Sequence, residues 1–156
     1  MRCTLEFYRP TLGTPVGPIL GANYCVETPN STGLPATLVG TGTKLIANND
    51  FGVYAQGLPI NSPGYFICSP NQAQVPGPGG SQGTLCVGSS TGRYLSQVGN
   101  AGIFGIIPLN VDLTAIPQPT GNVVVQPGET WNVQCWYRDS IFGFPISNFT
   151  DGYTIT

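Results

Sequence analysis

Turn-forming residues divide this chain into short segments, and their spacing limits the folds that it can adopt. Clusters such as NSPG (61–64), PGPGG (76–80) and QPG (126–128) recur along the chain, separated by roughly eight to twelve residues. The segments between them are rich in Val, Ile, Thr, Tyr and Phe and lack the apolar spacing of an amphipathic helix. Short strands with frequent turns are typical of sandwiches and barrels. The sequence therefore predicts an all-β, turn-rich fold, a two-sheet antiparallel β-sandwich.

The expected strands are the apolar segments between these turns. We place them at 4–8, 24–27, 37–41, 44–47, 52–56, 65–68, 84–87, 93–96, 105–111, 122–125, 131–139 and 153–156, with one short helical turn within 111–117. A hydrophobic content of 40% argues against disorder, although the chain contains 22 Gly and 15 Pro. We expect a single sandwich domain over 19–156. Residues 1–18 form a peripheral N-terminal segment or an added strand, because TLGTPVGP resembles a linker.

The stretch PGETWNVQCWYRD (127–139) has the clearest strand pattern. Apolar side chains occupy every second position, with mostly polar ones between them. A period of two is typical of a half-buried strand. The inner face is expected to consist of Trp131, Val133, Cys135 and Tyr137.

The same alternation places Trp136 on the outer face, beside Gln134 and Arg138. An exposed tryptophan flanked by amide and guanidinium groups could stack on a sugar or anchor a protein contact. Tyr94 and Tyr153 are further candidates for such a face. The alternative is that another strand, loop or domain covers Trp136.

The alternation also sorts the cysteines. Cys68 and Cys135 share faces with core residues, which predicts an inner disulfide, whereas Cys25 and Cys86 fall on the outer side, which predicts a surface disulfide. Several pairings remain compatible with the sequence. Cys3 is left unpaired, as a buried thiol or an intermolecular bridge.

The chain has few residues suited to catalysis. It contains no histidine, which removes the commonest general base and the Ser-His and Cys-His arrangements. Asp139 and Asp151 flank one segment and are the carboxylates expected to lie close together. With Asn148 they could hold calcium, or serve as a glycosidase pair; the alternative is that both are solvated loop-end aspartates. We therefore expect no enzyme activity and no cofactor, with calcium as the one metal that these side chains could hold.

Charged residues make up only 8% of the chain, and the formal net charge is −2. This composition argues against nucleic acid as a partner, because phosphate binding needs Lys and Arg. No apolar run is long enough to span a bilayer. Five cysteines favour an extracellular or cell-surface location, although the first residues, MRCTLEFYRP, show no signal peptide.

Several motifs in fixed order suggest a family. The runs PGGSQGTLCVGSSTGRY, VDLTAIPQPTG, VQPGETWNVQCWYRD and SNFTDGYTIT resemble an uncharacterised domain of about 130 residues, often C-terminal, in large secreted proteins of planctomycete bacteria. The last strands also resemble those of fibronectin-III-like and immunoglobulin-like sandwiches. The resemblance to the planctomycete domain covers roughly residues 19–156 and implies an exported all-β module attached to other domains, with no known activity.

Together these features predict a non-catalytic extracellular structural or adhesive module. Low charge limits the repulsion that keeps proteins monomeric, so we expect self-association or contact with neighbouring domains of a secreted protein. The first alternative is a carbohydrate-binding module that uses exposed aromatic side chains. The second is a calcium-binding accessory domain.

Overall fold

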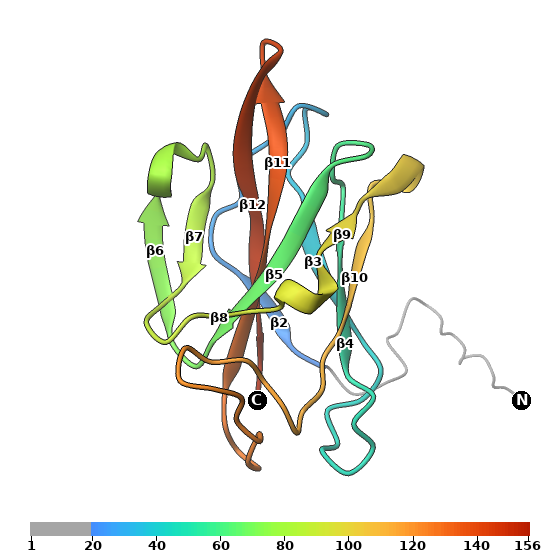
Figure 1. The fold of residues 1–156 in the computed structure, drawn as a ribbon, viewed down its shortest axis with the longest axis vertical. Coiled ribbons are helices and arrows are strands. Elements are labelled where there is room, and N and C mark those ends of the chain that lie inside the picture. Colours follow the sequence, from blue (N-terminus) through green and yellow to red (C-terminus); the bar gives the residue numbers. More distant parts are fainter. Residues whose placement is uncertain (1–19) are drawn as a thin grey trace, which may run out of the picture.

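Two antiparallel sheets face each other in the computed structural model, which describes residues 20–156 (Figure 1). The predicted all-β sandwich is confirmed: these residues form strands, turns and short 3₁₀ segments, and none of their helices could cross a membrane. The elements are β2 (Ala22–Tyr24), β3 (Thr37–Thr41), β4 (Gly52–Gln56), β5 (Pro63–Ser69), β6 (Gln72–Pro76), η1 (Pro78–Gly80), β7 (Thr84–Val87), β8 (Gly92–Arg93), η2 (Leu95–Gln97), β9 (Gly99–Asn100), η3 (Gly102–Phe104), β10 (Ile107–Asn110), β11 (Trp131–Ile141) and β12 (Phe144–Ile155).

The larger sheet has six strands. Its order is β2-β12-β11-β5-β8, with β9 also paired to β5. The smaller sheet has three strands in the order β10-β4-β3. The β11–β12 hairpin runs the length of the molecule in Figure 1, with Trp131 opposite Ile155 at one end and Ile141 opposite Phe144 at the other.

The main core lies between the two sheets. The smaller sheet contributes residues such as Leu38, Val53 and Leu109, all nearly inaccessible to solvent. The larger sheet contributes Phe66 and the predicted inner face of β11, namely Trp131, Val133, Cys135 and Tyr137. The alternation in this strand therefore assigned the inner face correctly.

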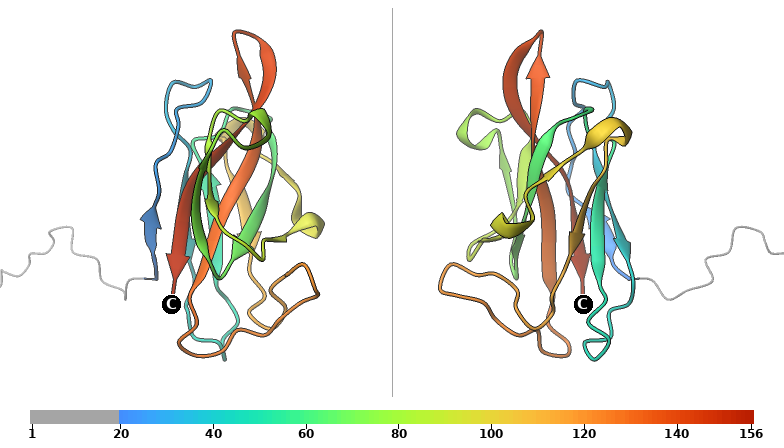
Figure 2. Two further views of the ribbon diagram at one scale, coloured as in Figure 1. Left: turned by 90° about the vertical axis from the view of Figure 1, so that its left-hand side faces the viewer. Right: turned by 45° about the vertical axis from the view of Figure 1, so that its right-hand side comes forward.

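A third layer covers part of the outer face of the larger sheet. The β6–β7 hairpin forms a separate two-stranded sheet, seen beside the larger sheet in Figure 1 and in the right view of Figure 2. A second apolar cluster, Ile67, Val87 and Phe149, lies beneath it. The prediction of a half-buried strand at 131–139 was therefore wrong, because most side chains on both faces of β11 are buried.

Most predicted strands are present, although many differ at their ends. Strands 37–41, 52–56 and 84–87 have the expected bounds. The strands expected at 44–47 and 122–125 are wrong: the first is largely a turn, and the second makes only an isolated bridge to Ile116. Instead of a helical turn, 111–117 contains a turn in which Asp112 accepts a hydrogen bond from the Thr114 amide at 2.9 Å. The strand expected at 4–8 and the whole 1–18 segment lie outside the described residues.

Candidate functional site

Trp136 is covered on one side rather than displayed on a flat face. It packs against the second apolar cluster beneath the β6–β7 hairpin. Its ring centroid lies 5.3 Å from that of Tyr65, and the Arg138 guanidinium carbon lies 5.2 Å from the same ring. The alternative reading, that another strand covers Trp136, is the one that the structure supports.

The other residues expected on a sugar-binding face are buried. Gln134 is completely buried, and Tyr94 and Tyr153 are each only 6% exposed, in the main core. The prediction that they are exposed was wrong: Gln134 is covered by the β6–β7 hairpin, whereas Tyr94 and Tyr153 belong to the core between the two sheets. Of the five residues predicted to form this face, only Arg138 is largely exposed.

Gln134 instead joins the hairpin to the sheet. Its side-chain oxygen accepts a hydrogen bond from the Cys86 amide at 2.8 Å. Its side-chain nitrogen donates to the Thr84 and Thr150 carbonyls, both at 2.8 Å. A buried amide with all three groups paired links β7, β11 and β12 and has a structural role.

The carboxylates predicted to bind calcium do not meet. Asp139 lies opposite Ile146 in the β11–β12 ladder. Asp151 therefore lies five positions further along β12, a distance of roughly 17 Å at the usual strand rise. The expected loop between them is a long hairpin, so both the calcium site and the glycosidase pair were wrong. No group of three or more His, Cys, Asp or Glu suited to a metal occurs among residues 20–156.

Each of the three proposed calcium ligands makes structural hydrogen bonds, so the expectation of solvated loop-end aspartates was also wrong. Asp139 accepts from the Ser31 amide at 3.1 Å and from the Gln82 side chain at 2.5 Å. The Asn148 side chain donates to the Thr28 carbonyl at 3.3 Å and accepts from the Phe149 amide at 2.8 Å. These contacts tie the loops at this end of the sandwich to β11 and β12.

Asp151 connects the two sheets at their edge. Its carboxylate accepts hydrogen bonds from the Leu38 amide of β3 at 2.8 Å and from the Asn23 side chain of β2 at 2.7 Å. Burial raises the pKa of Asp151 from its ordinary value of 3.8 to about 6, although these two hydrogen bonds act in the opposite direction.

This pKa predicts a dependence of stability on pH. Between pH 3.8 and about 6 the folded protein retains a proton on Asp151 that the unfolded chain has released. The contribution of Asp151 to the free energy of unfolding is therefore fully present below this window and falls as the pH rises through it. In denaturant titrations at several pH values, the free energy of unfolding should decline less with rising pH for Asp151→Asn than for the wild type. Parallel curves for the two proteins would contradict this assignment.

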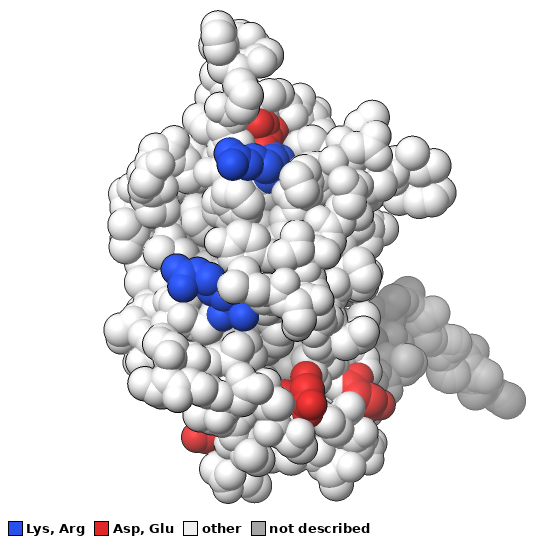
Figure 3. All heavy atoms as spheres, in the orientation of Figure 1, with Lys and Arg blue, Asp and Glu red and all other residues white. Residues whose placement is uncertain are grey.

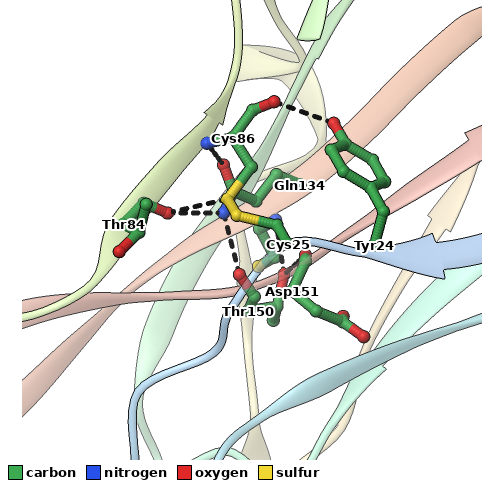
Figure 4. The surroundings of a disulfide bond; sticks show 8 residues. Tyr24, Cys25, Thr84, Cys86, Gln134, Thr150 and Asp151 are labelled. Carbon is green, nitrogen blue, oxygen red and sulfur yellow. Dashed lines mark hydrogen bonds between the residues drawn. A yellow bond between two sulfur atoms is a disulfide. The ribbon is translucent and has the colours of Figure 1, made fainter. Parts of the chain in front are cut away.

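The disulfide between Cys25 and Cys86 is present, as predicted (Figure 4). It joins the end of β2 to β7, with Cα atoms 6.3 Å apart. The Tyr24 hydroxyl supports the same connection by donating to the Cys86 carbonyl at 2.8 Å. The surface position was wrong for Cys86, which is fully buried. Cys25 follows the end of β2 and has a φ of 75°, so the alternation of side chains along a strand does not apply to it.

The predicted inner disulfide is absent, and Cys68 and Cys135 are buried free thiols. Both side chains face the core, as alternation indicated, but they belong to adjacent strands of one sheet. Cys68 lies opposite Val133 and Cys135 opposite Phe66, which makes the cysteines diagonal neighbours, roughly 7–8 Å apart. That exceeds the usual Cα separation of a disulfide. Burial raises the pKa of Cys68 to about 12. Cys3 lies outside the described residues.

One end of the sandwich contains an apolar cavity of about 550 Å³. Its walls come from strands of the larger sheet and from the loops before β4 and β11, and include Ile46, Leu113, Ile116, Val125, Trp131 and Ile155. Lys44 and Leu45 also line it and are exposed. The volume is within the range of sites that bind small molecules or apolar side chains.

The opposite end carries an apolar protrusion. The tip of the β11–β12 hairpin extends beyond the neighbouring loops in Figure 1. Its side chains are Ile141, Phe142 and Phe144, which are 40%, 99% and 72% exposed. We call these residues with Gly143 the apex. Figure 3 shows no charged side chain at this protrusion.

Neither feature was recognised as a site from the sequence. The apex had a readable signal, because Ile-Phe-Gly-Phe places three large apolar residues around a hairpin turn where polar residues are usual. The cavity had none, because its walls come together only when loops distant in sequence meet.

No protein family, no curated protein and no solved structure matches this chain.

Proposed function

We propose that this chain is a non-catalytic extracellular module that acts by self-association in a structural or adhesive assembly. The observation that carries the proposal is the exposure of large apolar side chains at the apex. Phe142 is 99% exposed and makes the tip of a protruding hairpin. Exposed apolar side chains grouped at one place mark interaction surfaces.

Other observations support this function. The Cys25–Cys86 disulfide suits an oxidising environment such as the extracellular space. Asp139 and Asp151 are engaged in hydrogen bonds that hold loops and sheets together, which favours a structural role for them over catalysis. Sugar binding has less geometric support, because Gln134, Tyr94 and Tyr153 are buried.

Self-association can be tested by sedimentation velocity over a wide range of protein concentration. We expect the weight-average sedimentation coefficient to rise with concentration in a Cys3→Ser background, which excludes covalent linkage through Cys3. The sedimentation coefficient should rise in the absence of reductant. A protein that remains monomeric at millimolar concentration would contradict the proposed function.

A further inference from the structure

The apolar apex and the apolar cavity lie at opposite ends of the same long hairpin. β11 begins at Trp131, which lines the cavity, and ends at Ile141, which belongs to the apex. Ten residue steps at the usual strand rise separate them by roughly 34 Å. In Figure 1 the apex is at the top of the molecule, and the loops before β4 and β11 are at the bottom. A convex apolar surface and a concave one therefore lie at opposite ends of the molecule.

The residue at the tip is poorly suited to its backbone. Ile141 pairs with Phe144, which leaves a two-residue turn in which Phe142 and Gly143 have φ values of 47° and 82°. Positive φ at both central residues is the type I′ pattern, for which Asn-Gly is preferred. A bulky residue with positive φ is uncommon. Phe142 thus combines an unfavourable backbone conformation with full exposure of its ring.

Within the described residues, no packing compensates for the unfavourable backbone conformation of Phe142, because a side chain that is 99% exposed makes almost no contacts. Conflicts between a residue and its local structure are expected at functional positions. An aromatic ring that is fully exposed to water would gain free energy by entering an apolar pocket on a partner, because its apolar surface is then removed from water.

We propose that molecules of this chain associate head to tail, with the apex of one molecule inserted into the apolar cavity of the next. This inference rests on the proposed self-association and specifies its two surfaces. The surfaces differ from each other, so the contact is heterologous, and because they lie at opposite ends it extends into open chains rather than closing as a dimer.

The cavity matches the apex in polarity, and its volume is within the range of sites that bind small ligands. It encloses about 550 Å³, and the rings of Phe142 and Phe144 each offer roughly 150–250 Å² of surface for burial. Together they cover less than the roughly 1,200–2,000 Å² of a standard stable interface. We therefore expect weak association in solution, visible at high concentration and strengthened where many copies are held close together.

Two single substitutions test the two surfaces separately. Phe142→Asn removes the ring and supplies a residue that tolerates positive φ. It should weaken association without lowering the midpoint of thermal unfolding, a combination that a purely structural residue would not show. Leu45→Asp places a charge at the cavity, on a side chain that is 62% exposed.

Leu95→Asp is the matched control, because Leu95 is 63% exposed and belongs to neither surface. We expect Phe142→Asn and Leu45→Asp each to weaken association about tenfold or more, and Leu95→Asp to leave it unchanged. Ala47→Trp serves as a second cavity variant if Leu45→Asp is poorly folded, because Ala47 is exposed and lines the cavity.

Mixing the two defective variants decides the arrangement. The intact apex of Leu45→Asp can enter the intact cavity of Phe142→Asn, so a mixture should form one-to-one dimers and no larger species. Sedimentation of the mixture, with one variant fluorescently labelled, measures this directly. Absence of such dimers, or unchanged association of either variant alone, would overturn the head-to-tail arrangement. Because the wild type is measured in parallel, a monomeric wild type would instead show that self-association itself fails.

Discussion

Replacing Gln134 with leucine is expected to lower the free energy of unfolding by roughly 3–5 kcal/mol. Leucine matches glutamine in approximate size but leaves the Cys86 amide and the Thr84 and Thr150 carbonyls without their side-chain partner. Each buried polar group left without a hydrogen bond costs about 1–3 kcal/mol. Urea denaturation followed by tryptophan fluorescence would measure the loss.

Gln56→Leu is a suitable control for this experiment. Gln56 is exposed, and its side chain makes only a long hydrogen bond of 3.4 Å to Thr37. It should change the free energy of unfolding by less than about 0.5 kcal/mol. A cost below about 1 kcal/mol for Gln134→Leu would mean that the β6–β7 hairpin is not held to the sheet by this amide.

Removing the disulfide by the double substitution of Cys25 and Cys86 with alanine should have an effect of similar size. The bridge closes a loop with a sequence separation of 61 residues. Loop closure of this length restricts the unfolded chain by an entropy worth roughly 4 kcal/mol at room temperature. Denaturant titrations under non-reducing conditions should show this decrease in the free energy of unfolding.

The reductant supplies an internal control. It should destabilise the wild type by a comparable amount and leave the double variant unchanged, because Cys68 and Cys135 are already free thiols. Non-reducing peptide mapping should recover Cys25 linked to Cys86. If reduction destabilised both proteins equally, another disulfide would have to account for it.

The period-two pattern predicted the inner face of β11 because side chains in any strand alternate between faces. It could not predict the outer face. Asn132 and Gln134 look like solvent-exposed residues in the sequence, yet both are buried and hydrogen-bonded under the β6–β7 hairpin. In the sequence, a buried polar residue whose hydrogen bonds are all made within the protein looks the same as an exposed one that is hydrogen-bonded to water.

The cysteines show the same limit in another form. Alternation states which face of a strand a residue occupies, but not which strands are neighbours. It therefore could not show that Cys68 and Cys135 lie on adjacent strands of one sheet, offset from each other in register. The cavity likewise depends on loops from both sheets, such as those that carry Ile46 and Val125.

The long β11–β12 hairpin also determines how an assembled chain of these modules would respond to pulling. Both strands run uninterrupted from the apex to residues that line the cavity, Trp131 and Ile155. Tension that enters at the apex and leaves at the cavity would travel through covalent backbone along the whole molecule. Under such a load the sheets need not slide or unzip. The mechanically weakest point of the assembly would be the non-covalent joint between modules, which can reform after it breaks.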